Sequence, residues 1–123
     1  MTLCPFCSPD PDRVFFKGRK VFALWDAYPI NPGHALVIPF RHVGSWFDAT
    51  PEEQSEILRA IAVVRSEIET RHNPPGYNIG VNDGFAAGQT VGHLHLHVIP
   101  RYDGDVPDPR GGIRWVIPDR APY

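Results

Sequence analysis

The sequence of 123 residues has no long apolar run and little excess of either charge. Its 12 basic and 14 acidic residues give a formal net charge of -2, so the chain lacks the excess of positive charge that is typical of DNA- and RNA-binding proteins. The longest apolar stretches, 21–25 and 35–40, fall far short of the ~20 residues that cross a bilayer. We therefore expect neither nucleic acid nor a membrane as a partner.

Cysteine is scarce as well, since the chain has only Cys4 and Cys7. One such pair cannot form the framework of a disulfide-rich secreted fold, and the first residues lack the basic region and the apolar core of a secretory signal. We expect a protein of the reducing cytoplasm in which the two cysteines serve metal or redox chemistry.

Fourteen prolines and eleven glycines interrupt the chain without reaching the level typical of disorder. The prolines gather near the two ends, and we find no repeat, charge block or internal linker. This length is usual for one domain. The sequence therefore predicts a single domain over 1–123, with a core that carries the motifs at about 4–101 and an irregular tail at 102–123.

Five segments have the composition of short strands, because they are rich in β-branched, aromatic or alternating apolar residues and are bounded by turn residues. One helix is also predicted: Thr50 is its N-cap, Pro51 occupies its first position and Glu53 completes a capping box. It should end before Asn73 and the prolines that follow. We expect an α+β fold with one main helix and a mostly antiparallel sheet of about five strands, at 14–17, 21–25, 35–39, 77–82 and 93–99.

Three of the six histidines, His93, His95 and His97, alternate with apolar residues. In a strand they would share one face, with the apolar residues turned to the core. Nucleophilic catalysis by the middle imidazole, with a neighbour as proton donor, fits this spacing. Incidental histidines and a single metal ion are the alternatives; one ion could take all three only with strain, because the outer two would lie about 13 Å apart.

The loop before these histidines, at 82–90, contains glycines, an amide and a hydroxyl. Glycines let the backbone approach a ligand closely, and Gln89 and Thr90 supply hydrogen bonds, so the composition suits a phosphoryl group. A glycine-rich loop alone is more often a plain turn. Its place beside the histidines favours the phosphate site.

The segment 88–101 resembles the signature of the histidine triad (HIT) family of nucleotide hydrolases and transferases, in which three histidines alternate with apolar residues. Every position of that motif is filled, and 32–39 resembles a second landmark of the family. The order of strands, helix and loop agrees over roughly 4–101. The resemblance is closest to a zinc-containing, bacterial-type branch of dinucleoside polyphosphate hydrolases, and it implies a homodimer.

By this resemblance, His95 would attack the α-phosphorus of an AMP-containing substrate and form a nucleotidyl-histidine that water resolves. His97 would hydrogen-bond the phosphate or the leaving group, while Gln89 and Thr90 would bind the phosphate and the bridging atom. Three further residues would assist: Asp26 at the ribose, Asn82 near the phosphate and His34 through hydrogen bonds to the triad. Without the resemblance, Asp26 is a turn residue and Asn82 an ordinary strand-end residue.

An attacking imidazole must be neutral, with one nitrogen free and the other donating a hydrogen bond, which we expect a backbone carbonyl to accept. A histidine normally has a pKa of about 6.5. We therefore expect activity to fall on acidification.

The Cys4–Cys7 spacing suits half of a tetrahedral zinc site, and the same spacing occurs in thiol redox proteins. A redox motif would lie between a strand and a helix, whereas this pair precedes a proline-rich stretch. The family resemblance implies that His42 and His93 complete a structural zinc site, which would fix the N-terminal segment to the catalytic strand. No organic cofactor is implied.

The tail allows two interpretations. Arg110 and Arg114 could contact distal phosphates of a long substrate, with Trp115 over a base or across a dimer. Alternatively, 113–117 is an edge strand with solvated arginines.

The sequence thus predicts a HIT enzyme that splits AMP-containing phosphoanhydrides, with diadenosine polyphosphates as the leading substrate class and AMP as a product. Adenosine phosphoramidates are the alternative substrates, and phosphate is the alternative acceptor, which would make the protein a nucleotidyl transferase. A nucleotide-binding regulator with little turnover and a metal hydrolase that uses the three histidines are the other classes considered.

Overall fold

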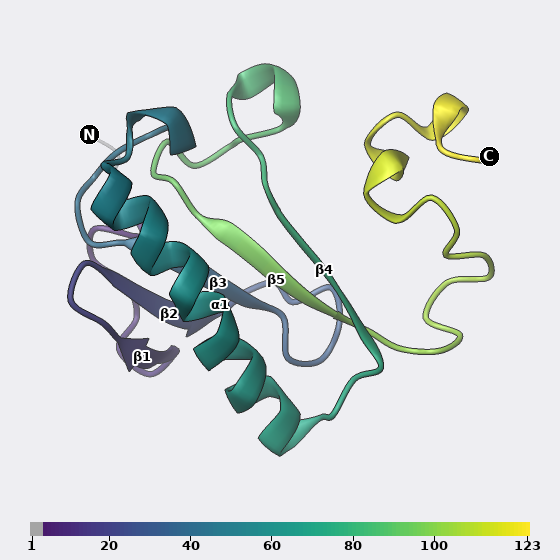
Figure 1. The fold of residues 1–123 in the computed structure, drawn as a ribbon, viewed down its shortest axis with the longest axis horizontal. Helices are drawn as coiled ribbons and strands as arrows, with labels where there is room; N and C mark the ends of the chain where they lie inside the picture. Colours follow the sequence, from purple (N-terminus) through teal and green to yellow (C-terminus); the bar gives the residue numbers. More distant parts are fainter. Residues whose placement is uncertain (1–3) are drawn as a thin grey trace.

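The computed structural model describes residues 4–123, so the first three residues of the predicted domain 1–123 lie outside the described residues. Within the described part, five strands form one antiparallel sheet in the order β1-β2-β3-β5-β4, and one long helix covers a face of it (Figure 1). This is the predicted α+β fold. The elements are β1 Val14–Lys17, β2 Val21–Trp25, β3 Ala35–Pro39, α1 Pro51–Arg71, β4 Gly76–Val81 and β5 Leu96–Arg101.

Both ends of α1 lie where the sequence places them. The Thr50 hydroxyl accepts a hydrogen bond from the Glu53 N–H, and the Glu53 carboxylate accepts one from the Thr50 N–H, which is the predicted capping box. The helix ends at Arg71, ahead of the prolines. Its buried Ile57, Val64 and Ile68 pack against the sheet.

The first three strands have their predicted bounds, whereas the last one begins later than predicted. Strand β5 starts at Leu96, and our expectation of a strand from His93 is wrong. The physical reason is that the Leu94 N–H donates to the carbonyl of Val43, at 2.7 Å, and not to a neighbouring strand. Residues 93–95 are therefore not part of the strand. The predicted alternation is nevertheless confirmed, because Leu94, Leu96 and Val98 pack in the core on the helix side, while the rings of His95 and His97 contact each other on the opposite side.

The face of the sheet away from α1 carries a second, smaller apolar cluster that includes Phe6, Leu24 and Leu36. His97 of β5 is paired with Leu36 of β3, and paired residues of an antiparallel sheet point to the same side. The side chain of His97 therefore lies on the face that the helix leaves open.

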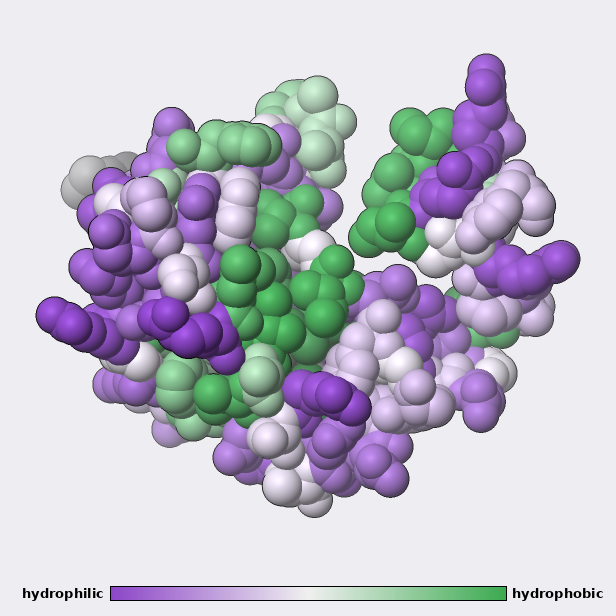
Figure 2. Space-filling model, in the orientation of Figure 1, coloured by the Kyte–Doolittle hydropathy of each residue, from purple (hydrophilic) through white to green (hydrophobic). Residues whose placement is uncertain are grey.

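The chain after β5 contains two short 3-10 helices, η3 Gly112–Val116 and η4 Pro118–Arg120. The alternative of an edge strand at 113–117 is wrong, because Gly111 and Gly112 have positive φ values of 99° and 49° that turn the backbone into η3. In Figure 2 a hollow separates this tail from the body, and apolar atoms lie on its inward side. Within residues 4–123, no helix combines the length and the apolar character that a membrane crossing requires.

Candidate active site

The ring of His95 is held by a backbone carbonyl. Its Nδ1–H donates to the carbonyl oxygen of His93, at 2.8 Å, which is the type of contact expected from the sequence. Since Nδ1 carries the proton, the neutral ring has its lone pair on Nε2. The rings of Phe6 and His97 both pack against this imidazole, with centroids 5.0 Å and 5.2 Å away. The contacts thus fix both the tautomer and the position of His95.

A second set of hydrogen bonds fixes the tautomer of His97. The N–H of Ile30 donates to Nδ1 of His34, at 3.2 Å, so the proton of neutral His34 is on Nε2. That nitrogen lies 2.9 Å from Nδ1 of His97 and 3.3 Å from a carboxylate oxygen of Asp26. His97 therefore accepts at Nδ1 and carries its own proton on Nε2.

Burial keeps both of these imidazoles neutral. It lowers the pKa of His97 to about 4, with further lowering from the positive charges that His95 and His34 can carry and a smaller opposing effect of Asp26. Burial also lowers the pKa of His34, although Asp26 opposes this shift. At neutral pH, the pair acts as a chain of hydrogen bonds between uncharged rings.

The low pKa of His97 predicts a loss of stability in acid. Between about pH 6.5, the usual value for histidine, and about pH 4, the unfolded chain binds more protons at this position than the native state. The free energy of unfolding therefore decreases as the pH falls through this window. We expect the melting temperature of His97→Asn to depend less on pH than that of the wild type. Equal slopes for the two proteins from pH 7 to pH 4 would contradict this origin.

Asp26, His34 and His97 also bring donor atoms within 4.8 Å of one another. A metal ion would need the lone pair of His34 Nε2, but that nitrogen is protonated as long as Nδ1 accepts from Ile30. The contacts of this group therefore favour a hydrogen-bonded relay over a cation site.

The second group of ligand atoms is different. Cys4, Cys7, His42 and His93 offer one ligand atom each, all within 4.8 Å of one another. Sγ of Cys4 is 3.4 Å and Sγ of Cys7 is 3.6 Å from Nδ1 of His93, and Sγ of Cys7 is 3.1 Å from Nδ1 of His42. Tetrahedral zinc would separate sulfur and nitrogen ligands by about 3.6 Å.

Hydrogen bonding prepares one of these ligands. Nε2 of the fully buried His93 donates to the carbonyl of Pro39, at 2.8 Å, which leaves Nδ1 unprotonated toward the thiols. Burial lowers the pKa of His93; the hydrogen bond to the Pro39 carbonyl opposes this shift, and His42 and His95 add to it, so the ring stays neutral as a ligand must. The four residues form a possible metal-binding cluster that is compatible with zinc.

The predicted phosphate-binding residues of the loop form no hydrogen bond with the three histidines in the described part of the chain. Gln89 Nε2 donates to the carbonyls of Gly44 and Val91, at 2.8 Å and 3.0 Å, and its Oε1 accepts from the Gly84 N–H, at 2.8 Å. This amide therefore braces the loop. Asn82 and Thr90 are exposed at the two ends of the same segment.

Two groups in the site were missed by the sequence analysis. Phe6 packs on His95. The sequence does contain a signal for this contact: Phe6 lies between Cys4 and Cys7, so a metal site formed by the two cysteines and His93 also places Phe6 near the histidines. The second group is the N–H of Ile30, which sets the tautomer of His34. Because every residue except proline has a backbone N–H, the residue type at position 30 does not predict this contact.

The sequence model of the HIT domain family matches residues 8–104 of this chain. The chain belongs to the HIT family. The matched range includes all of the histidines, whereas Cys4 and Cys7 precede it and the end of the tail follows it.

Curated relatives in this family carry enzyme names. AP-4-A phosphorylase of Mycobacterium tuberculosis is 37% identical over 105 residues, which cover 85% of this chain and 54% of the relative. The asymmetrical bis(5'-nucleosyl)-tetraphosphatase of Schizosaccharomyces pombe is 40% identical over 97 residues, covering 79% and 53%. The chain thus spans about half the length of these relatives.

Solved structures of HIT proteins share the fold. A HIT family protein from Bacillus anthracis superposes with a TM-score of 0.75 at 36% sequence identity, covering 83% of this chain and 73% of the other. This similarity supports the sheet order and the single long helix described above.

Proposed function

We propose that this HIT protein cleaves diadenosine polyphosphates through a covalent nucleotide on His95. The observation that carries the proposal is the pair of fixed tautomers: His95 has its lone pair on Nε2, and the adjacent His97 has its proton on Nε2. One ring is thereby ready to attack and the other to donate. The names of the two curated relatives support the class of substrate.

The reaction proceeds in two displacements. Nε2 of His95 attacks the α-phosphorus, and the bond from that phosphorus to the bridging oxygen breaks. The ring becomes positively charged, which strengthens its hydrogen bond to the carbonyl of His93. The Nε2–H of His97 stabilises the negative charge that develops on the leaving phosphate. Water then attacks the same phosphorus, the P–N bond breaks, and AMP and a proton are released.

The substrate-binding residues are proposed from the family motif. Gln89 and Thr90 bind the phosphates, and Asn82 lies near them; Gln89 must then exchange at least one of its present loop hydrogen bonds for the ligand. Asp26 binds the ribose hydroxyls. Its carboxylate already accepts the Tyr28 N–H, at 2.9 Å, so the acceptor is oriented before substrate arrives.

Phosphate is a second candidate for the acceptor, because the Mycobacterium tuberculosis relative is named a phosphorylase. With phosphate in place of water, the second displacement yields ADP and the protein is a nucleotidyl transferase. Adenosine phosphoramidates stay candidate substrates because Asp26, rather than an amide, occupies the ribose position.

We propose structural zinc at Cys4, Cys7, His42 and His93. All four positions are filled by protein ligands, so the ion would stabilise the fold and would not activate water. Its binding joins the N-terminal segment to the residue whose carbonyl holds His95. Two cysteines that serve as thiolate ligands fit the reducing cytoplasm, which we propose as the compartment.

We further propose a single catalytic domain over 1–123 that acts as a homodimer. β4 is an outer strand of the sheet, with an exposed Ile79, and Figure 2 shows apolar atoms over this strand and the adjacent part of α1. A second copy placed here would cover them.

The function is tested by incubating the protein with diadenosine tri- and tetraphosphate and with adenosine phosphoramidate, with and without phosphate. We expect AMP from the dinucleotides at a higher kcat/KM than from the phosphoramidate. With diadenosine tetraphosphate, whose hydrolysis gives AMP and ATP, ADP that appears only with phosphate would assign the transferase instead. Tight AMP binding without any product would assign a regulator and contradict the proposal.

A further inference from the structure

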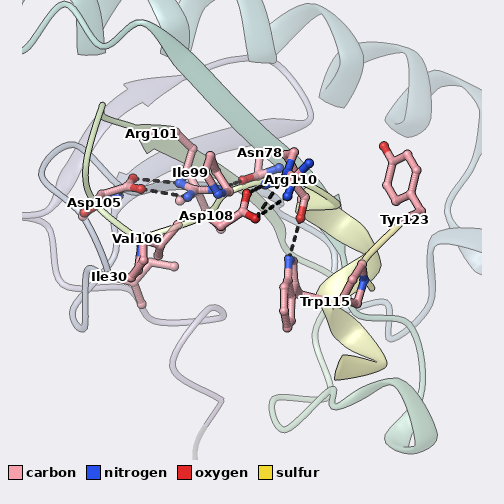
Figure 3. A pocket seen from close by; sticks show the side chains of 15 residues that line it. Ile30, Asn78, Ile99, Arg101, Asp105, Val106, Asp108, Arg110, Trp115 and Tyr123 are labelled. Carbon is pink, nitrogen blue, oxygen red and sulfur yellow. Dashed lines mark hydrogen bonds and ion pairs between the residues drawn. The ribbon is translucent and has the colours of Figure 1, made fainter. Parts of the chain in front are cut away.

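A cavity of about 800 Å³ lies between the sheet and the C-terminal tail (Figure 3). We call it the tail cavity. Ile99 of β5 and Asn78 of β4 contribute to it from the sheet, and Trp115 and Tyr123 contribute from the tail. In Figure 3, Trp115 lies across the opening from Ile30 and Val106.

The tail cavity continues the active site along β5. Side chains of a strand alternate, so Ile99 follows His97 on the same face of the sheet, about 7 Å further on. Ile30, which also lines the cavity, donates its N–H to His34. The attacking ring, the donor ring and the cavity therefore follow one another in this order.

The tail reaches the strand beside His97. Gly80 of β4 is paired with His97, and a Cβ on Gly80 would lie 3.5 Å from Cδ1 of Ile113. The first turn of η3 thus borders the position where a leaving group departs. The HIT match ends at residue 104, so Ile113 and the rest of η3 lie outside the matched range.

Charges within the tail cavity are largely paired. Nε and Nη2 of Arg101 lie 2.8 Å from the two oxygens of Asp105, and Nη2 of Arg110 lies 2.9 Å from Asp108. These are the two arginines that line the cavity, and each has its own carboxylate. The remaining side chains include aliphatic and aromatic ones. This lining suits an uncharged, planar group better than a chain of phosphates.

Contacts inside the tail fix its aromatic wall. The indole N–H of Trp115 donates to the carbonyl of Arg110, at 2.9 Å. The guanidinium of Arg114 donates to the carbonyl of Ala121, at 3.2 Å, and lies 4.8 Å from the ring centre of Tyr123. Gly111 fits because any Cβ would be 2.8 Å from the carbonyl oxygen of Ala121. The wall is built before a ligand arrives.

We propose that the tail cavity binds the nucleobase of the leaving nucleotide, stacked on Trp115. This inference rests on the proposed function, since it extends the substrate from the phosphorus at His95 past His97 to its second nucleoside. Aromatic stacking accepts any base, so the tail would select for a second nucleoside without strong preference for its identity.

The test compares Trp115→Ala with Trp115→Phe and with Val116→Ala, an exposed tail residue that does not line the cavity. We expect Trp115→Ala to raise KM for diadenosine tetraphosphate about tenfold, the loss typical of one stacking contact. Adenosine phosphoramidate, which has no second nucleoside, should keep its KM. Trp115→Phe should restore most of the affinity, and Val116→Ala should resemble the wild type. An unchanged KM for the dinucleotide, or equal changes for both substrates, would overturn the proposal.

A binding measurement separates this inference from the proposed function. In a His95→Ala background, diadenosine tetraphosphate and AMP are titrated by calorimetry with and without Trp115→Ala. A loss of about tenfold for the dinucleotide alone supports the tail cavity even if the wild type turns over neither substrate. Equal losses for both ligands, or none, overturn it.

Discussion

Replacing His95 with alanine is expected to lower the release of AMP from diadenosine tetraphosphate by at least about 10³-fold, because the variant has no atom to form the covalent nucleotide. The loss should appear in kcat. Phosphate binding by the remaining groups is retained, so KM should change less. Initial rates at saturating substrate provide the measurement.

A matched control is His72→Ala. His72 is exposed and caps α1 with its backbone N–H, so its side chain is not required for the helix end. We expect this variant to turn over at the wild-type rate. Rapid quenching of the wild type during turnover should give a peptide that contains His95 and carries one AMP. If His95→Ala, folded by circular dichroism, retained the wild-type rate, another nucleophile would have to be sought.

Replacing Cys4 with serine is expected to remove most of the zinc and to lower the melting temperature by roughly 10 °C, which corresponds to about 3 kcal/mol for a domain of this size. The thiolate is a far better zinc ligand than a hydroxyl, and three ligands do not complete a structural site. Elemental analysis of protein purified without added metal, together with a thermal melt, provides both readings.

Ser8→Ala changes an exposed residue beside the cluster and serves as the control. It should leave the zinc content and the melting temperature unchanged. Zinc content and stability of Cys4→Ser equal to those of the wild type would remove Cys4 from the site. A chelator should reproduce the effect of Cys4→Ser on the wild type and have little further effect on the variant.

The sheet and helix could be predicted because local signals and tertiary packing agree. Thr50, Pro51 and Glu53 specify the start of α1 within a few residues of sequence, and the helical spacing of Ile57, Val64 and Ile68 matches their burial. The capping box needs no information from the rest of the chain.

The departure at His93 could not be predicted from alternation. The pattern of His93, Leu94 and His95 fits a strand, and Leu94 is buried as a strand would bury it. What distinguishes the two conformations is the acceptor of the Leu94 N–H, a carbonyl at Val43 in a distant loop. Side-chain periodicity reports which residues face the core and not which backbone groups are paired.

The positions of the protons on the histidines of the site could not be predicted from the sequence either. The proximity of His34 to the triad follows from the family motif, but its tautomer depends on the N–H of Ile30, and that of His97 depends on His34. A chain of donors and acceptors is defined only when the distances are known.

His93 has one further consequence for anyone who shortens or redesigns this domain. Its ring contacts both cysteines, its carbonyl orients His95, and Phe6 from the same N-terminal segment covers the ring of His95. Deleting the first seven residues would thus strip one wall from the reaction centre, although every residue of the triad would remain. A fragment that keeps this wall must begin before residue 8, where the match to the HIT family starts.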